Sequence, residues 1–293
     1  MSEADNPPIL EVDNLARHFP VRGFLNRKVG SLRALDDVSF AVDAGEILGI
    51  VGESGCGKST LGKTLMGIHE PSEGEVRMLG ERIASPGQKR AAKIRARLQY
   101  VYQDPGASLD PRWTLRRSLH EPLIIHTDWS REKREEKVRE IVKAVGLPVE
   151  HLDLYPHEIS GGQQRRVGLA RILVLGPELV IFDEPTSGLD VSVQATVLRL
   201  FRDLKSEFDL TYLFISHDLA VVQSICDRVI VMYLGRIVEI GKTADVFATP
   251  RHPYTQALLS AAPRIGGPRV IENFSLQGEP PDPSNVPSGC RFR

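Results

Sequence analysis

Short apolar runs recur along the chain and are separated by longer amphipathic stretches. The run Ile47–Val51 is apolar apart from one glycine, and Leu179–Phe182 is apolar throughout, as expected of strands buried on both faces. Val38, Phe40 and Val42 instead alternate with polar residues, which predicts a half-buried strand there. Strands of both kinds, separated by amphipathic helices, predict an α/β fold.

The pattern becomes helical in the middle of the chain. Residues 130–145 are dense in Arg, Lys and Glu, with Val138, Ile141 and Val142 on one face of a helix. We interpret 105–160 as a helical subdomain, and its charge run as a solvated face rather than a binding patch.

The remaining elements follow from the same patterns. We expect strands at 9–12, 75–79, 98–102 and 213–215, helices at 165–175, 192–207, 243–247 and 253–262, and a hairpin of 229–233 with 236–240. Residues 1–8 are expected to be a disordered lead, and a basic loop with glycines is expected over 23–33. The last stretch, 263–293, is rich in Pro and Gly, loses periodicity and forms a C-terminal extension.

Composition narrows the class of partner. The 293 residues suffice for one large or two modest domains, and 41% of them are hydrophobic, enough for a substantial core. Lys and Arg number 37 against 38 Asp and Glu, giving a net charge of -1, which argues against nucleic acid as the main partner. No apolar run approaches the ~18 residues of a membrane span.

The cysteines indicate a reducing compartment. Cys56, Cys226 and Cys290 lie far apart and form no Cys-x-x-Cys pair, so a disulfide framework is not expected. The N-terminus is acidic and lacks the apolar core of a signal peptide.

A glycine-rich loop after the first buried strand carries the clearest chemistry. Its residues are Gly52, Glu53, Ser54, Gly55, Cys56, Gly57, Lys58, Ser59 and Thr60. The glycines let successive backbone N–H groups point at phosphate oxygens, and the helix that follows adds its positive N-terminal end. Lys58 can reach the β- and γ-phosphates, and the Ser59 hydroxyl can ligate Mg²⁺. The alternative is a chance match in a glycine-rich turn, which the strand before and the helix after disfavour.

Polar residues also lie at the ends of several predicted strands. Strand ends, where open α/β sheets place their ligands, carry Gln103, Asp183, Glu184 and His217. Asp183 can hold Mg²⁺ directly or through water, Glu184 can act as a general base, and His217 can touch a γ-phosphate. Taken singly, each could be an ordinary loop residue.

Two further features have alternatives that the sequence leaves open. A second helix opens with Ser160, Gly161, Gly162 and Gln163, which is either a second phosphate site or a helix end capped by Ser160. Phe19 either stacks on an adenine ring or fills the core at a strand end.

Taken in order, these motifs resemble those of the ATP-binding cassette (ABC) ATPases. The resemblance rests on Gly52–Thr60, Gln103, Ser160–Gln163, Leu179–Glu184, Ser187–Asp190 and His217, and it covers about residues 9–262. The Ser-Gly-Gly-Gln signature separates this family from other phosphate-loop NTPases. Ile159 and Gly188 depart mildly from the usual Leu and Ala. The resemblance implies a RecA-like core with an antiparallel β subdomain and the α-helical subdomain over 105–160.

Other residues resemble one branch of that family, the ATP-binding subunits of oligopeptide and dipeptide importers. They are Ser108–Arg112, Tyr155–Glu158, His252–Thr255, Gly278–Pro281 and Pro287–Cys290. The branch carries a C-terminal extension like the one at 263–293. The function implied is ATP hydrolysis that powers bacterial peptide uptake through a membrane permease.

The resemblance also implies roles for single residues. Lys58, Gln103, Glu184 and His217 would be catalytic, and Ser59, Gln103 and Asp183 would hold Mg²⁺. In the family, two subunits pair head to tail, so Ser160–Gln163 would contact the ATP of the partner subunit and Asp190 would lie at the dimer contact. The partners implied are a second ATPase subunit, expected to be a paralogue, two permease subunits and, indirectly, an extracytoplasmic peptide-binding protein. The location implied is peripheral, at the cytoplasmic face of the inner membrane.

Two points stay open. Some branch members bind an iron–sulfur cluster in the extension, and Cys290 is the candidate ligand here. One cysteine cannot supply the roughly four thiolates of a cluster, so we do not expect one in this chain. The alternatives for function are a soluble ABC ATPase not coupled to transport, or an importer subunit for nickel complexes or glutathione.

Overall fold

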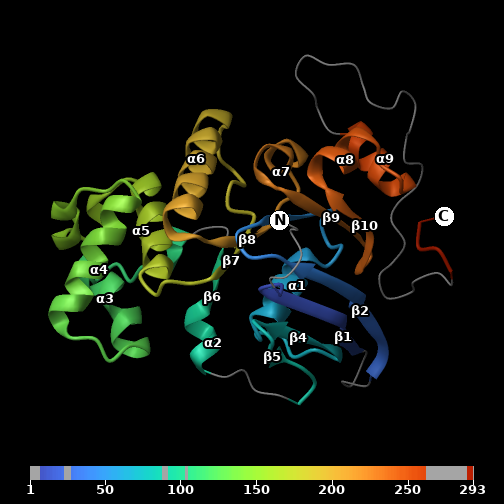
Figure 1. Ribbon diagram of the computed structural model, residues 1–293, viewed down its shortest axis with the longest axis horizontal. Coiled ribbons are helices and arrows are strands. Elements are labelled where there is room, and N and C mark those ends of the chain that lie inside the picture. The colour runs from blue at the N-terminus through green and yellow to red at the C-terminus, as the bar shows by residue number, and fades with distance from the viewer. Residues whose placement is uncertain (1–6, 23–27, 88–91, 103–104, 262–288, 293) are drawn as a thin grey trace. The chain divides into compact units, whose positions relative to one another are not determined.

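The structure is a computed structural model that describes residues 7–22, 28–87, 92–102, 105–261 and 289–292 (Figure 1). By its internal contacts the chain forms two compact units, which are described separately. The first comprises residues 1–90 and 213–293, and the second comprises residues 91–212.

The first unit contains an antiparallel sheet with the strand order β2-β1-β4-β5. Its strands are β1 (Leu10–Arg22), β2 (Lys28–Val42), β4 (Glu73–Met78) and β5 (Glu81–Ala84). Buried residues such as Leu10, Val12 and Leu15 supply the core side of β1. The predicted basic loop over 23–33 is wrong from Lys28 onward, because β2 already pairs with β1 there, with Arg33 opposite His18.

The glycine-rich loop of the first unit follows one of a second set of strands. They are β3 (Ile47–Val51), the hairpin of β9 (Arg228–Tyr233) and β10 (Arg236–Lys242), and the C-terminal residues of β8 (Thr211–Ile215). β3 is buried along its whole length and runs parallel to β9, with Leu48 opposite Arg228. The helices are α1 (Lys58–Leu65), α7 (Leu219–Ile225), α8 (Thr243–Ala248) and α9 (Pro253–Ala261).

The second unit combines a parallel strand pair with helices. β6 (Leu98–Val101) pairs in parallel with β7 (Leu179–Asp183). The helical elements are α2 (Ala92–Arg97), η2 (Pro105–Ser108), α3 (Leu115–His126), α4 (Arg131–Ala144), η3 (Val149–Asp153), η4 (Pro156–Glu158), α5 (Gly161–Leu173) and α6 (Val191–Phe208). Helices α3, α4 and α5 pack side by side (Figure 1). Residues 105–160 are thus largely helical, whereas their assignment as a separate subdomain stays a prediction.

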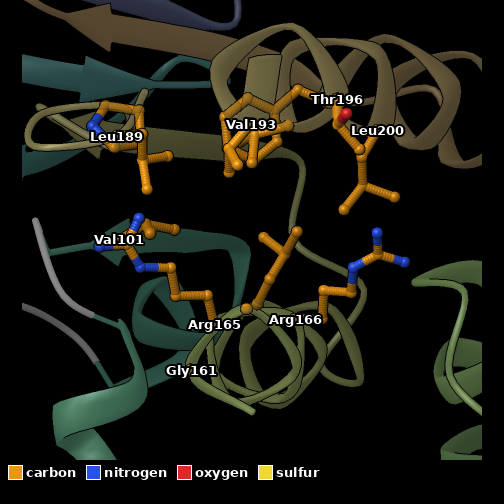
Figure 2. A pocket seen from close by; sticks show the side chains of 13 residues that line it. Val101, Gly161, Arg165, Arg166, Leu189, Val193, Thr196 and Leu200 are labelled. Carbon is orange, nitrogen blue, oxygen red and sulfur yellow. The ribbon is translucent and has the colours of Figure 1, made fainter. Parts of the chain in front are cut away.

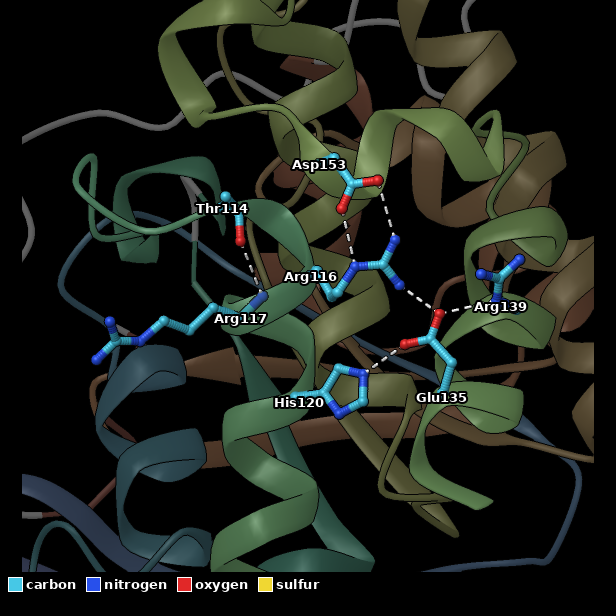
Figure 3. A network of polar contacts seen from close by, with 7 residues as sticks. All are labelled: Thr114, Arg116, Arg117, His120, Glu135, Arg139 and Asp153. Atoms are coloured by element: carbon cyan, nitrogen blue, oxygen red, sulfur yellow. Dashed lines mark hydrogen bonds and ion pairs between the residues drawn. The ribbon is translucent and has the colours of Figure 1, made fainter. Parts of the chain in front are cut away.

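A network of ion pairs ties α3 to α4 and η3 (Figure 3). Arg116 donates to Asp153 at 2.9 Å and also to Glu135, which accepts further from Arg139 at 2.8 Å and from His120 at 3.0 Å. Burial alone would raise the pKa of Glu135, but these donors outweigh it and the pKa is about 2. The Glu135 carboxylate is therefore charged at neutral pH and links α4 to α3, while Arg116 links α3 to η3.

The domain division expected from the sequence, 9–262 followed by an extension at 263–293, stays a prediction. Most of the extension and residues 1–6 lie outside the described residues.

Among the described helices, none combines the length and the apolar character needed to cross the hydrocarbon core of a bilayer.

Candidate functional site

The glycine-rich loop joins β3 to α1, and two of its glycines are required by close backbone contacts. Gly52 has φ +150°, and a Cβ there would lie 2.3 Å from the carbonyl oxygen of Met232. Gly57 has φ +111°, and a Cβ there would lie 2.4 Å from the carbonyl oxygen of Ala34. Any larger residue would push the loop away from its neighbours, so these glycines fix a tight turn at the start of α1.

Lys58 curls back over this loop and is only 5% exposed. Its Nζ donates to the carbonyl oxygens of Gly52 at 2.7 Å and Glu53 at 2.9 Å. The Cys56 sulfur lies 3.7 Å from the same nitrogen. Burial raises the pKa of the Cys56 thiol, and Lys58 offsets this only in part. The loop therefore holds one ammonium group beside a protonated, buried thiol.

Two residues to which the sequence analysis gave no role at the loop hold it from outside. The backbone N–H of Glu53 donates to the Tyr254 hydroxyl at 2.9 Å. The backbone N–H of Gly235, in the β9–β10 turn, donates to the Cys56 carbonyl at 2.8 Å. Both contacts join positions about 180 to 200 residues apart, which no local pattern in the sequence can reveal.

His217 stands just beyond β8 and is exposed. The turn around it is fixed by its neighbours, since the N–H of Asp218 donates to the Ser216 hydroxyl at 3.0 Å. The Asp218 carboxylate in turn accepts from Ala220 at 2.9 Å and caps α7. His217 thus lies at the end of a strand, as the sequence predicts, on a backbone held by two side-chain contacts.

In the second unit, Asp183 is the last residue of β7, and Tyr100 of β6 reaches it. The Tyr100 hydroxyl donates to Oδ2 of Asp183 at 2.5 Å. Tyr100 lies opposite Ile181, so its ring and the Asp183 side chain project from the same face of the strand pair. Burial and the adjacent carboxylate raise the pKa of Tyr100, so the phenol stays a donor. The sequence analysis missed Tyr100.

Glu184 follows Asp183 in an unusual backbone conformation. Its φ is +52°, in the left-handed region, which costs a non-glycine residue roughly 1–2 kcal/mol. Its carbonyl accepts from the N–H of Ser187 at 3.2 Å, which closes a turn. Backbone strain of this kind concentrates at functional sites, so the conformation favours a functional role over that of an ordinary loop acid.

The second glycine-rich helix start is capped by Ser160, which is one of the two alternatives that the sequence left open. Ser160 caps α5, accepting from the N–H of Gln163 at 3.3 Å, and the Gln163 side chain accepts from the N–H of Ser160 at 2.9 Å. Gly161 and Gly162 are exposed, and apart from the adjacent residues and the backbone of α5 itself, no described atom lies within 4 Å of a Cβ built on either. Within the described chain nothing requires glycine there, which leaves room for a group from outside to approach the helix end.

Asp190 caps the next helix, α6. Its Oδ1 accepts from the N–H of Val193 at 2.9 Å and from the Ser192 hydroxyl at 2.7 Å. These two donors lower the pKa of Asp190. The carboxylate therefore organises the helix start beside an exposed chain segment.

A pocket of about 410 Å³ lies between α5 and α6 (Figure 2). The side chains of Arg165 and Arg166 extend from α5 toward it, opposite Val193 and Leu200 of α6 (Figure 2). Most of its wall is aliphatic. The lining also includes Gly161 and Gly162 at the start of α5.

Three further predicted site residues are Phe19, Gln103 and Cys290. Phe19 carries the Arg17 guanidinium over its ring at 4.5 Å and meets His69 edge-on at 5.2 Å. Gln103 lies outside the described residues. Cys290 is exposed, whereas Cys56 and Cys226 are buried. Among the described residues, no group of three or more His, Cys, Asp or Glu side chains could hold a metal ion.

Comparison with protein families gives two matches. Residues 35–187 match the model described as "ABC transporter", and residues 238–293 match "Oligopeptide/dipeptide transporter, C-terminal region". The first match contains the glycine-rich loop and the Asp183-Glu184 pair.

Curated relatives match the chain over almost its whole length. The chain is 49% identical to the oligopeptide transport ATP-binding protein AppF of Bacillus subtilis, over 100% of this chain and 90% of the relative. It is 48% identical to the dipeptide transport ATP-binding protein DppF of Escherichia coli, over 97% of this chain and 85% of the relative.

Solved structures match as well. One is cbiO1 from Clostridium perfringens, with a TM-score of 0.71 and 28% identity, over 83% of this chain and 92% of that one. Another is the ATP-binding cassette MJ0796 in a dimeric state bound to ADP and Pi, with a TM-score of 0.68 and 27% identity, over 80% and 98% of the two chains. These matches confirm the fold class predicted from the sequence.

Proposed function

The chain belongs to the ATP-binding proteins of ABC transporters, in their oligopeptide/dipeptide branch, and from that premise we propose that it hydrolyses ATP to power peptide import through a membrane permease. The observation that carries the choice of peptides is the match of residues 238–293 to the C-terminal region of peptide transporters. A soluble ATPase not coupled to transport would not account for that match. The match also favours peptides over nickel complexes or glutathione as cargo.

The phosphates of ATP bind at the glycine-rich loop. The tight turns at Gly52 and Gly57 orient backbone N–H groups, and the N-terminus of α1 adds its positive end. Lys58 exchanges its two carbonyl partners for phosphate oxygens, which are stronger acceptors because they carry charge. The adenine ring stacks on Phe19, whose aromatic face suits it.

The donor set fits Mg²⁺. Ser59 and Asp183 offer the hard oxygen ligands that this ion prefers, and we propose that they hold it together with Gln103. When bound, the ion neutralises negative charge on the phosphates. Tyr100 fixes the orientation of the Asp183 carboxylate through its 2.5 Å hydrogen bond, so one oxygen of that carboxylate stays directed away from the phenol.

Glu184 takes the proton of the attacking water as a general base. A positioned base of this kind contributes about 10²–10⁴-fold in rate. Because Glu184 has a positive φ, its backbone departs from the strand geometry of Asp183. The two neighbouring acids can therefore serve different roles, Asp183 at Mg²⁺ and Glu184 at the attacking water. His217 contacts the γ-phosphate from its own strand end. We do not expect an iron–sulfur cluster in this chain, because Cys290 is the one candidate ligand that the sequence analysis offers.

The exposed start of α5 binds the ATP of a partner subunit. Gly161 and Gly162 leave the helix end open, and Ser160 and Gln163 order it by mutual capping. One chain therefore has two helix ends suited to phosphate, one for its own ATP and one for that of its neighbour. Asp190 organises the adjoining segment at the dimer contact. We infer a paralogous partner subunit.

The permease docks on the second unit. A hollow of about 280 Å³ there is lined by residues that include Tyr102, Ile125 and Leu175. Ile124 and Ile125 of α3 are 58% and 66% exposed, which is unusual for adjacent large apolar side chains. A short apolar segment of one of two permease subunits fits this surface, and the chain then lies peripherally at the cytoplasmic face of the inner membrane. An extracytoplasmic peptide-binding protein delivers the cargo.

Uptake in cells tests the proposal. A strain lacking the chain is complemented with the wild type, Glu184→Gln, Ile125→Glu or, as a matched control, Glu136→Gln at an exposed position on α4. We expect the wild type and Glu136→Gln to restore uptake of radiolabelled di- and oligopeptides, and the other two variants to fail. Ile125→Glu should still bind ATP as tightly as the wild type. Peptide uptake that does not depend on the chain, or that Glu184→Gln restores, would contradict the proposal.

A further inference from the structure

Two residues near the C-terminus, Arg291 and Phe292, contact groups that hold the glycine-rich loop. Arg291 is only 9% exposed, and Phe292 lies in a cluster of aromatic rings. The roles proposed above use neither residue. We call the pair the C-terminal brace.

Arg291 joins the β9–β10 turn to β2. Its guanidinium donates to the carbonyl of Leu234 and to the carboxylate of Asp36. Asp36 also accepts from Arg236 at 3.1 Å, and its side chain is 14% exposed. A guanidinium that is buried and shared between a carboxylate and a carbonyl makes strong, directional contacts.

The turn that Arg291 holds is the turn that contacts the loop. The N–H of Asp36 donates to the carbonyl of Gly235 at 2.9 Å, and the N–H of Gly235 donates to the carbonyl of Cys56 at 2.8 Å. One continuous chain of hydrogen bonds thus runs from Arg291 through Asp36 and Gly235 to the middle of the glycine-rich loop.

Phe292 reaches the loop by a second route. Its ring meets Tyr233 at 5.6 Å and Tyr254 at 5.7 Å, both in edge-to-face geometry. Tyr254 is fully buried, and its hydroxyl accepts from the N–H of Glu53 at 2.9 Å. Edge-to-face ring pairs attract one another beyond the area that they bury, so they bias where the Tyr254 ring sits.

We propose that Arg291 and Phe292 are positioning residues for ATP, which brace the glycine-rich loop at Cys56 and Glu53 in the conformation that binds phosphate. The inference rests on the proposed role of that loop in binding ATP. A phosphate cradle depends on the direction of each backbone N–H, and the brace sets two anchor points, three residues apart, within that cradle. Small displacements of such groups cost large factors in binding and rate.

The test compares ATP affinity in the full chain. Arg291→Met keeps the aliphatic stem and removes the guanidinium, and Phe292→Leu keeps an apolar side chain and removes the ring. We expect each to raise the dissociation constant for ATP about fivefold to tenfold, because Arg291→Met removes hydrogen bonds and Phe292→Leu removes edge-to-face ring contacts that hold the loop. Arg77→Met, which removes an exposed ion pair to Glu75 in the same unit, should leave the constant unchanged.

Amide hydrogen exchange without nucleotide separates positioning from general stability. We expect the Gly235 N–H to exchange at least about tenfold faster in Arg291→Met, and the Glu53 N–H to do so in Phe292→Leu, with amides of β3 unchanged. If Arg291→Met does not fold, Phe292→Leu decides alone.

Unchanged ATP affinity in a folded Phe292→Leu variant would overturn the inference, as would weaker affinity without faster exchange at Glu53. A separate outcome concerns the proposed function itself. If Lys58→Ala binds ATP as tightly as the wild type, the loop is not the ATP site, and both proposals fail together.

Discussion

The Tyr100 hydroxyl donates to the Asp183 carboxylate at 2.5 Å across the parallel pair β6 and β7. Removing this donor frees a carboxylate that is proposed to help hold Mg²⁺. We therefore predict that Tyr100→Phe needs about threefold to tenfold more Mg²⁺ for half-maximal ATP hydrolysis, less than the full effect of losing one hydrogen bond to a charged group because Tyr100 acts on the ion only through Asp183. A magnesium titration of phosphate release measures this.

Tyr102→Phe is the matched control for that variant. Tyr102 lies 4.7 Å from the Tyr100 ring and is 50% exposed. It should titrate like the wild type. An identical Mg²⁺ requirement in Tyr100→Phe would show that the phenol does not orient Asp183 for the metal.

The open start of α5 gives a prediction in which stability and activity diverge. Gly161→Ala introduces a methyl group that meets no described atom within 4 Å beyond the adjacent residues and the backbone of α5, and alanine in a helix gains roughly 0.5–1 kcal/mol over glycine. We expect unchanged or slightly higher stability toward urea. We also expect ATP hydrolysis to fall at least about tenfold, because the methyl would stand between the helix end and a phosphate, and a displacement of about 1 Å is costly there.

Gly52→Ala provides the contrast. Its Cβ would lie 2.3 Å from the Met232 carbonyl, so this variant should lose both stability and activity. If Gly161→Ala hydrolyses ATP at the wild-type rate in the assembled complex, the start of α5 does not contact nucleotide.

The ion-pair network at Glu135 gives a prediction about pH. Because the pKa of Glu135 is lowered from 4.5 to about 2, its charged form stabilises the folded chain fully above about pH 5 and loses that effect as pH falls toward 2. Glu135→Gln should lower the free energy of unfolding by about 1–2 kcal/mol at pH 7, after allowance for solvent screening of a partly exposed group.

Urea unfolding at pH 7 and at pH 3.5 measures that difference. It should shrink at the lower pH, where the wild-type carboxyl of the unfolded chain is protonated. Glu136→Gln, at the next position and exposed, should match the wild type at both values. A difference that stays constant with pH would mean that the lost contacts are not electrostatic.

Much of the site could be predicted because its residues are close in sequence. The glycine-rich loop, the Asp183-Glu184 pair and the capped start of α5 each occupy one short stretch, where strand and helix periodicity place them at element ends. The glycines at 52 and 57 are recognisable as loop residues even without the carbonyls that they approach.

The contacts that orient these residues could not be predicted. Tyr100 lies 83 positions from Asp183, and Arg291 lies 255 positions from Asp36. The extent of β2 was missed for the same reason, since residues 28–33 are basic and become a strand only through pairing with β1. Pairing between distant segments is decided by the fold and leaves no local periodicity.

Hydrolysis by Glu184→Gln tests the central claim most directly. The full chain is assembled with its partner subunits, Mg-ATP is added, and phosphate release and mass are followed, with Glu136→Gln as the control. We expect Glu184→Gln to hydrolyse ATP at least about 10²-fold more slowly and to accumulate as an ATP-bound dimer, because binding is kept and the base is lost. Unchanged hydrolysis would contradict the assignment of Glu184 as the base and the mechanism built on it.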